Sequence, residues 1–231
     1  MRISAVTRRG TGSSAEDRVL IGGRILCEEE FSGEFERPCV FGVADGVGGN
    51  AGGDIAAQFV CERLEGIALT PENAAAVNEA LLAFARKTPG RERMASTFSG
   101  VFPEGRLLHV GNTRICAVQG GYLKQLTPDM TTRNYLLSLG RNEEAEECSR
   151  SEITACFGGG RASFFSPYTA DIPLAGTLLL TSDGIHDHAD ADALESVLTR
   201  GGSDLDLCRD IADLALECGS EDDMSVIIAR F

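Results

Sequence analysis

Four short segments with alternating apolar residues follow one another between residues 97 and 126. They span 97–102, 107–110, 115–119 and 122–126, and each break between them contains glycine. Alternation with a period of two is typical of β-strands with one buried face, and short glycine-containing breaks fit hairpin turns. We therefore predict an antiparallel meander, which does not fit the strand–helix alternation of a parallel sheet.

The remaining apolar runs predict a mixture of strands and helices. Further strands are expected at 3–7, 17–27, 39–44, 153–157, 177–181 and in the final segment MSVIIARF. Helices are expected after the glycine-rich turn that follows Ala44, after the Thr70-Pro71 start signal, at 191–199, and at 203–218 behind a capping box. Adjacent helices between runs of antiparallel strands indicate an α+β fold, with sheet packed on sheet and helices outside.

The charge balance separates several classes of function. The 231 residues include 21 Lys or Arg and 35 Asp or Glu, which gives a formal net charge of −14. Such an acidic chain is poorly suited to contact nucleic-acid phosphates or an anionic membrane, and well suited to bind divalent cations. The first residues lack the apolar core of a signal peptide, no apolar run reaches the length of a membrane span, and no two cysteines form a C-x-x-C pair. We expect a single cytoplasmic domain over 1–231.

Acidic residues stand where four of the predicted strands begin or end. Asp45-Gly46 follows the strand VFGVA, and Asp183-Gly184 follows the strand TLLLTS. Glu16-Asp17 precedes a strand, and so does Asp222-Asp223. A single Asp-Gly in such a place is typical of a turn. Four acidic positions in the same context favour a second interpretation, in which the carboxylates converge in the folded chain.

Converging carboxylates need a cation among them. Like charges within a few Å raise each other's pKa and destabilise the fold unless a cation is bound. Oxygen ligands without His or Cys select Mg²⁺, Mn²⁺ or Ca²⁺ over zinc. Two such ions about 4 Å apart lower the pKa of a shared water and hold a phosphate ester beside it. Gly46 permits a tight turn and can offer its backbone carbonyl to the same ions.

Six motifs resemble, in sequence order, those of the type 2C metal-dependent protein serine/threonine phosphatases, the PPM family. They are AED at 15–17, FGVADGVGG at 41–49, ASTFSGVF at 95–102, HVGNTRICAVQGGYLKQLTPDMT at 109–131, LLLTSDGIHD at 178–187 and EDDMSVIIARF at 221–231. The resemblance covers almost the whole chain and is to the bacterial form, a minimal catalytic domain. It implies a four-layer α/β/β/α sandwich in which two antiparallel sheets pack face to face and helix pairs lie outside.

The resemblance also implies a reaction and its site. A water or hydroxide bridging two Mn²⁺ or Mg²⁺ ions would hydrolyse phosphoserine or phosphothreonine in proteins, without attack by a protein side chain. Asp45 would bridge the two ions, and the Gly46 carbonyl would bind one of them. The other implied metal ligands are Glu16, Asp183 and Asp222. The implied partners are phosphoprotein substrates and a cognate Ser/Thr kinase pathway, with no nucleic acid and no membrane.

Two positions depart from the family pattern in ways that affect ligand binding. Gly12 stands where the family usually has an Arg that grips the substrate phosphate, so Arg8, Arg9 and Arg18 become the candidates for that contact. Asn112 stands where bacterial members commonly have an Asp that helps to hold a third ion. An amide brings no charge, and a third ion is therefore expected to bind weakly or not at all.

Three more side chains are expected near the ions without an assigned bond to them. Asp17 is expected to contact a metal ligand, Asp223 replaces the family's usual Asn, and Thr97 lies in a strand close to the metals. The segment between Thr131 and Arg150 is expected to border the site.

Two alternative functions remain open besides that of a phosphatase for small phosphoesters. The segment GVGGNA at 46–51 follows a predicted strand and opens a helix, as a dinucleotide-binding turn does, although Asp45 would then stand beside a pyrophosphate. The other alternative is a pseudophosphatase that binds a phosphoprotein or regulatory partner without turnover. Gly12 and Asn112 favour that alternative, whereas the intact Asp45, Asp183 and Asp222 oppose it.

Overall fold

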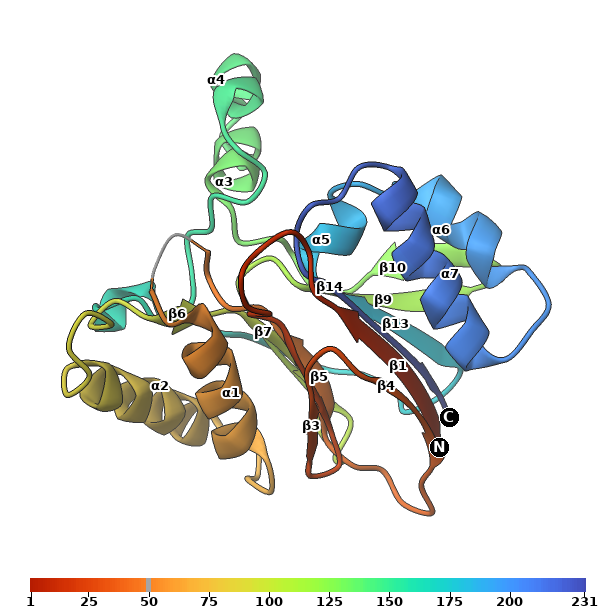
Figure 1. The fold of residues 1–231 in the computed structure, drawn as a ribbon, viewed down its shortest axis with the longest axis horizontal. Coiled ribbons are helices and arrows are strands. Elements are labelled where there is room, and N and C mark those ends of the chain that lie inside the picture. The colour runs from red at the N-terminus through yellow and green to blue at the C-terminus, as the bar shows by residue number, and fades with distance from the viewer. Residues whose placement is uncertain (49–50) are drawn as a thin grey trace.

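Two antiparallel sheets of six strands each form the centre of the computed structural model, which describes residues 1–48 and 51–231 (Figure 1). The first sheet, in the order β10-β9-β13-β14-β1-β4, consists of Tyr122–Gln125, Arg114–Gln119, Thr177–Thr181, Met224–Arg230, Arg2–Arg8 and Glu30–Glu34. The second sheet, in the order β12-β8-β7-β5-β2-β3, consists of Tyr168–Asp171, Arg106–Val110, Phe98–Val101, Phe41–Ala44, Arg18–Ile21 and Arg24–Leu26.

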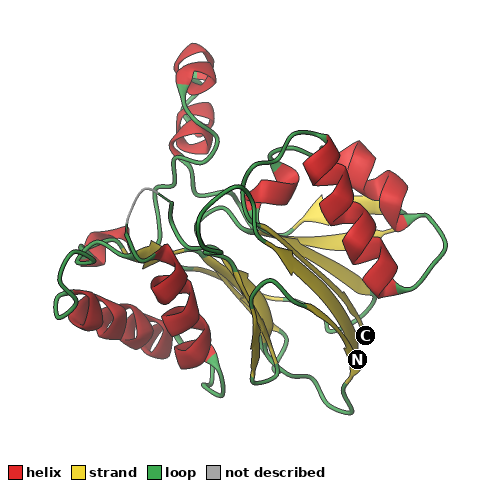
Figure 2. Ribbon diagram, viewed as in Figure 1, coloured by secondary structure: helices red, strands yellow, loops and turns green. Residues whose placement is uncertain are grey.

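Helices cover the outer face of each sheet (Figure 2). Helices α1 (Gly53–Leu64) and α2 (Pro71–Ala85) pack beside the second sheet, and α6 (Ala191–Leu198) and α7 (Asp204–Glu217) beside the first. The predicted α+β sandwich is therefore confirmed. The shorter elements are β6 (Ala95–Ser96), β11 (Phe157–Gly158), α3 (Thr132–Ser138), α4 (Asn142–Glu147), α5 (Asp183–His186) and the 3₁₀ helix η1 (Ala162–Phe164). Within the described residues, no helix has both the length and the apolar character that crossing a membrane requires.

The strand sequences follow from burial on both faces. In β14, Val226 and Ile228 belong to the apolar cluster beneath α6 and α7, whereas Ile227 and Ala229 face the layer between the two sheets. A strand buried on both sides reads as a continuous apolar run, because alternate residues fill different cores. The third apolar cluster lies between the second sheet and the α1–α2 pair, and includes the fully buried Phe98.

Two helix starts agree with their sequence signals. The Thr70 hydroxyl accepts a hydrogen bond from the Asn73 amide at 3.1 Å, and Pro71 opens α2. Ser203 and Asp206 form the reciprocal capping box that precedes α7. Each cap satisfies amide groups that have no partner within the helix.

Several expected elements are wrong in detail. The segments between 97 and 126 are strands, but β7 and β8 pair in the second sheet and β9 and β10 in the first, so the chain changes sheet between β8 and β9. The strand expected at 17–27 is the hairpin of β2 and β3, and the one expected at 153–157 is reduced to the two residues of β11. No pattern in the sequence predicted β4 and β12, which are short edge strands with exposed residues.

The glycine-rich segment 46–51 includes positions 49 and 50, which lie outside the described residues. Every strand pair that the structure describes is antiparallel. A dinucleotide-binding turn requires a parallel strand–helix–strand unit, so the described part of the fold does not support that alternative.

Candidate metal centre

Four carboxylate-bearing segments that are far apart in sequence meet at one end of the sandwich. Asp45 follows β5, and Glu16 lies just before β2, the antiparallel neighbour of β5. Asp183 follows β13, and Asp222 lies just before β14, the antiparallel neighbour of β13. Because antiparallel neighbours begin where their partners end, each pairing brings two of the carboxylates together, and the packing of the two sheets places both pairs around one cavity.

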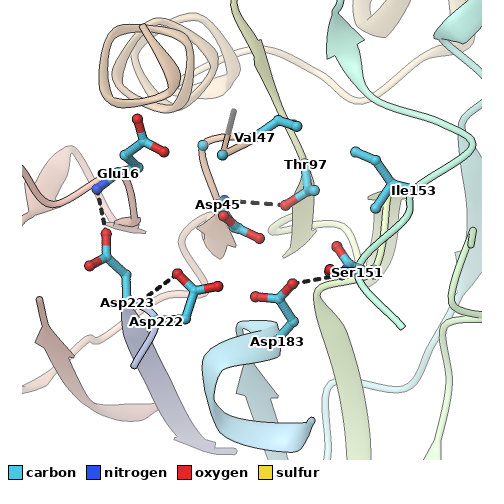
Figure 3. A pocket seen from close by; sticks show the side chains of 12 residues that line it. Glu16, Asp45, Val47, Thr97, Ser151, Ile153, Asp183, Asp222 and Asp223 are labelled. Atoms are coloured by element: carbon cyan, nitrogen blue, oxygen red, sulfur yellow. Dashed lines mark hydrogen bonds between the residues drawn. The ribbon is translucent and has the colours of Figure 1, made fainter. Parts of the chain in front are cut away.

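A cavity of about 250 Å³ lies among these residues. Figure 3 shows the carboxyl groups of Asp45, Asp183 and Asp222 directed toward a common space between the ends of their segments. The described residues that line the cavity are Glu16, Asp45, Gly46, Val47, Gly48, Thr97, Asn112, Ser151, Ile153, Asp183, Asp222 and Asp223. None of these residues is basic, so the charge of five carboxylates is not offset by the cavity lining.

The pKa values of the carboxyl groups reflect this accumulation of charge. Burial, together with the charges of Asp183, Asp17 and other acidic neighbours, raises the pKa of Asp45 well above its usual range. Burial and the Asp222 charge raise the pKa of Asp183 to about 6. The pKa of Glu16 is also raised, by burial and by the Asp223 and Asp54 charges. Each raised pKa means that the ionised carboxylate is less stable in the folded chain than in water. A bound cation would stabilise the ionised carboxylate.

The donor set fits hard divalent cations. It offers carboxylate oxygens and the Gly46 backbone, with no His or Cys among the described lining residues. Among residues 1–48 and 51–231, no three Asp, Glu, His or Cys side chains stand close enough together to hold an ion by themselves. The fit therefore depends on the donor type and on the unbalanced charge, and water would complete the coordination shells, as is usual for Mg²⁺.

Asp223 holds the segment that carries Glu16. Its Oδ1 accepts a hydrogen bond from the Gly10 amide at 2.8 Å, and its Oδ2 accepts hydrogen bonds from the amides of Glu16 and, at 3.3 Å, of Asp17 (Figure 3). Both carboxylate oxygens are therefore occupied by backbone donors. The side chain joins the start of β14 to the loop between β1 and β2 and so fixes the position of Glu16.

Asp223→Asn is expected to weaken metal binding. Asparagine would place an NH₂ group against a backbone N–H, which leaves at least one amide of the loop without an acceptor. We expect the Mn²⁺ affinity to fall about tenfold and Tm to fall by several degrees, measured by calorimetric titration and thermal unfolding. The matched control is Asp213→Asn, which makes the same chemical change on α7, away from the cavity; equal losses in both variants would contradict the prediction.

The other residues expected near the ions lie in and behind the cavity wall. The Thr97 hydroxyl accepts a hydrogen bond from the Asp45 amide at 3.2 Å, and the Thr97 amide donates to the Asp45 carbonyl at 2.8 Å. Asn112 donates from Nδ2 to Asp183 at 2.9 Å, while its buried Oδ1 has no partner among the described residues. Asp17 does not line the cavity; it is buried, and burial raises its pKa to about 8 despite the nearby Ser225 and Ser182 hydroxyls.

The three arginines expected to contact phosphate are held elsewhere. Arg8 pairs with Asp213 on α7, and Arg9 pairs with Glu28 at 3.3 Å. The Arg18 guanidinium donates to Gln58 and to the carbonyls of Ala15 and Asp17. None of the three is among the described residues that line the cavity, and their contact with phosphate stays a prediction.

Ser151 and Ile153 are cavity residues that the sequence interpretation missed. They belong to the end of the excursion that leaves the sandwich after β10 and contains α3 and α4, which project beside the site in Figure 1. An isolated bridge between Thr131 and Ile153 closes the base of this excursion. No residue of 131–150 is among the described lining residues, so the expectation that this segment borders the site stays a prediction. The sequence predicted a strand at 153–157 but did not indicate that its start faces the cavity, which only tertiary structure could reveal.

Comparison with known proteins finds similarity to bacterial serine/threonine phosphatases. No protein-family model matches the chain. The serine/threonine protein phosphatase PstP of Mycobacterium tuberculosis is 29% identical over 248 aligned residues, which cover 99% of this chain and 45% of PstP. The chain therefore spans about half the length of that curated relative.

Solved structures of bacterial phosphatases share the fold over almost their full length. The structure of M. tuberculosis PstP/Ppp has a TM-score of 0.78 and 26% identity, with 100% of this chain and 99% of that chain covered. The PstP catalytic domain in complex with two manganese ions has a TM-score of 0.74 and 25% identity, with 99% and 98% covered. Staphylococcus aureus Stp1, at 23% identity, has a TM-score of 0.81 with 99% and 94% covered. In sequence and in fold, the chain is similar to bacterial serine/threonine protein phosphatases.

Proposed function

We propose that residues 1–231 form a catalytic domain that hydrolyses phosphoserine and phosphothreonine in proteins with two Mn²⁺ or Mg²⁺ ions. One observation carries this proposal: Asp45, Asp183 and Asp222, from three distant segments, face one cavity with no basic side chain among its described lining residues. The likeness to PstP, whose catalytic domain has been solved with two manganese ions, supports the same conclusion.

The chain's own residues hold and orient the reactants. Asp45, Glu16, Asp183, Asp222 and the Gly46 carbonyl would bind the ions. When bound, two such ions neutralise charge on the phosphoryl oxygens and make water a nucleophile near neutral pH. The hydroxyls of Thr97 and Ser151 line the cavity, but no described lining residue is a histidine that could activate them as nucleophiles.

The proposal also names partners. A phosphatase of this specificity acts on phosphoproteins, and a Ser/Thr kinase must supply them. Val47, Ser151 and Ile153 are among the residues that line the cavity.

The direct test is turnover by the purified chain. We expect hydrolysis of p-nitrophenyl phosphate and of phosphoserine or phosphothreonine peptides with Mn²⁺, and its loss in EDTA. Sugar phosphates serve as the comparison that would reveal a small-ester phosphatase. A folded sample that binds phosphopeptides but shows no metal-dependent turnover would instead support the pseudophosphatase alternative.

Asn112 limits how many ions the cavity holds. Its NH₂ group is committed to Asp183, and only its neutral Oδ1 remains for a cation. We expect Asn112→Asp to raise the number of Mn²⁺ ions bound in a calorimetric titration and to lower Tm in EDTA, because a further carboxylate would face Asp183. Asn112→Ala removes the amide without adding charge, so it should lack the added ion; the same stoichiometry in all three proteins would refute this account.

A further inference from the structure

A basic segment stands out on this acidic chain. Residues 86–93, RKTPGRER, contain four basic side chains and one acidic one, whereas the whole chain has a net charge of −14. Arg161 adds a fifth basic side chain from the loop between β11 and η1. Among the described residues, none of the five forms an ion pair, although the chain carries 35 acidic residues. Their charges are therefore free for a ligand.

Two of these arginines line a surface hollow of about 320 Å³. Arg93 and Arg161 form it together with Gly159, Gly160 and Phe164. The Arg161 guanidinium lies 6.0 Å from the centre of the Phe164 ring, which supports its side chain from below. Two guanidinium groups around an open hollow suit a carboxylate or phosphate, because the planar guanidinium donates paired hydrogen bonds to such groups.

Strand β6 lies between a backbone segment of the metal cavity and the segment that leads into this hollow. On one edge of the strand, the Ala95 carbonyl accepts a hydrogen bond from the amide of cavity residue Val47. On the other edge, Ala95 pairs with Gly158, and Met94 accepts a hydrogen bond from the amide of Gly159 in the hollow. Neighbouring strands lie about 4.8 Å apart, so the backbone of Val47, which lines the cavity, is about 10 Å from that of Gly158, which directly precedes the hollow residues Gly159 and Gly160.

Arg91 adds positive charge beside the loop that follows the cavity residues. A Cβ atom built on Gly52, at the start of α1, would stand 3.2 Å from the Arg91 Cδ, so the arginine stem packs against this loop. An extended peptide advances about 3.3 Å per residue, and a separation of about 10 Å therefore corresponds to about three residues.

We propose that the basic hollow of Arg93 and Arg161 binds an acidic side chain of the phosphoprotein substrate, about three residues from the phosphorylated one. This inference rests on the proposed function and names the substrates that the same cavity favours. The hollow supplies the positive charge that the lining of the metal cavity lacks, at a distance that one peptide segment spans.

Phosphate release from a set of matched peptides tests the proposal. Each peptide carries one central phosphothreonine in neutral flanks, with three Asp residues at positions −4 to −2, or at +2 to +4, or with Lys or neutral residues there. We expect one of the two acidic peptides to have a kcat/KM about fivefold above the neutral peptide, and the Lys peptides to fall below it. Because the hollow is exposed, 0.5 M NaCl should abolish most of this preference.

The variant Arg93→Glu/Arg161→Glu should reverse the preference while turnover of p-nitrophenyl phosphate stays unchanged. The control Arg24→Glu/Arg37→Glu makes the same change in net charge at exposed positions on β3 and beyond β4, and should keep the parent's preference. Equal effects of both double variants, or no acidic preference in the parent, would overturn the proposal. If Arg93→Glu/Arg161→Glu does not fold, the test is the parent protein in 0.5 M NaCl, where an unchanged preference for the acidic peptide would overturn the proposal. A parent that hydrolyses the neutral peptide shows that the proposed function stands even when this inference fails.

Discussion

Asp45→Ala is expected to lower kcat/KM for p-nitrophenyl phosphate in Mn²⁺ by about 10²-fold or more. Asp45 stands at the end of β5, where its amide and carbonyl are both bonded to Thr97, so its carboxylate has a fixed position at the cavity. Burial, followed by the charges of Asp183, Asp17 and Asp222, raises its pKa. Removing it takes away the carboxylate that we propose to contact both ions.

The control for this measurement is Asp213→Ala. Asp213 is an exposed carboxylate on α7 that pairs with Arg8, and its loss should change the activity less than twofold. Asp45→Asn separates charge from shape, because it keeps the size of the side chain and removes the anionic oxygens. We expect it to lose nearly as much activity as Asp45→Ala. If the alanine variant kept more than a tenth of the parent's activity, the assignment of Asp45 as the central ligand would be wrong.

The positions of the carboxylates could be predicted because they depend on local rules. A buried strand must leave the sheet at its end, and the Asp-Gly pairs after β5 and β13 mark those exits in the sequence. Antiparallel pairing then brings the starts of β2 and β14 to the same edge. The pattern of the sequence therefore predicted which residues meet, although the part each plays in metal binding stays a prediction.

The connectivity of the strands was less predictable. The turns before and after β8 look alike in the sequence, yet the first joins strands of one sheet and the second carries the chain to the other sheet. Turn residues predict that the chain reverses direction, but they do not predict in which sheet the next strand pairs. Likewise, the polar edge strands β4 and β12 gain their structure from pairing with β1 and β8, which a local pattern does not show.

The contacts of the arginines were also not predictable from the sequence. A lone Arg near a motif has a long side chain that reaches several partners, and the sequence does not show which one it takes. Arg8 forms an ion pair with Asp213, and Arg9 forms one with Glu28. Arg93 and Arg161 form no ion pair among the described residues and line the hollow instead. Tertiary structure was therefore needed to distinguish a paired arginine from one available to a ligand.

The stability of the metal-free protein is expected to fall as pH rises from about 5 to 8. Burial and neighbouring charges raise the pKa of Asp183 to about 6 and that of Asp17 to about 8, from values near 4 in the unfolded chain. A raised pKa means that the folded state binds the proton more tightly. The stabilising contribution is therefore complete below the unfolded pKa and is lost as pH passes through the folded pKa.

Thermal unfolding in EDTA should accordingly give a Tm at pH 5.5 that is on the order of 5 °C higher than at pH 8. Mn²⁺ should raise Tm far more at pH 8 than at pH 5.5, because the ion replaces protons that the carboxylates have released. In Asp183→Asn, both the difference in Tm between pH 5.5 and pH 8 and the rise in Tm on adding Mn²⁺ should be smaller. The asparagine side chain has nearly the size of aspartate but does not titrate. A Tm in EDTA that is flat or rises over this range would mean that the carboxylates do not crowd one another, and the case for a cation among them would fail.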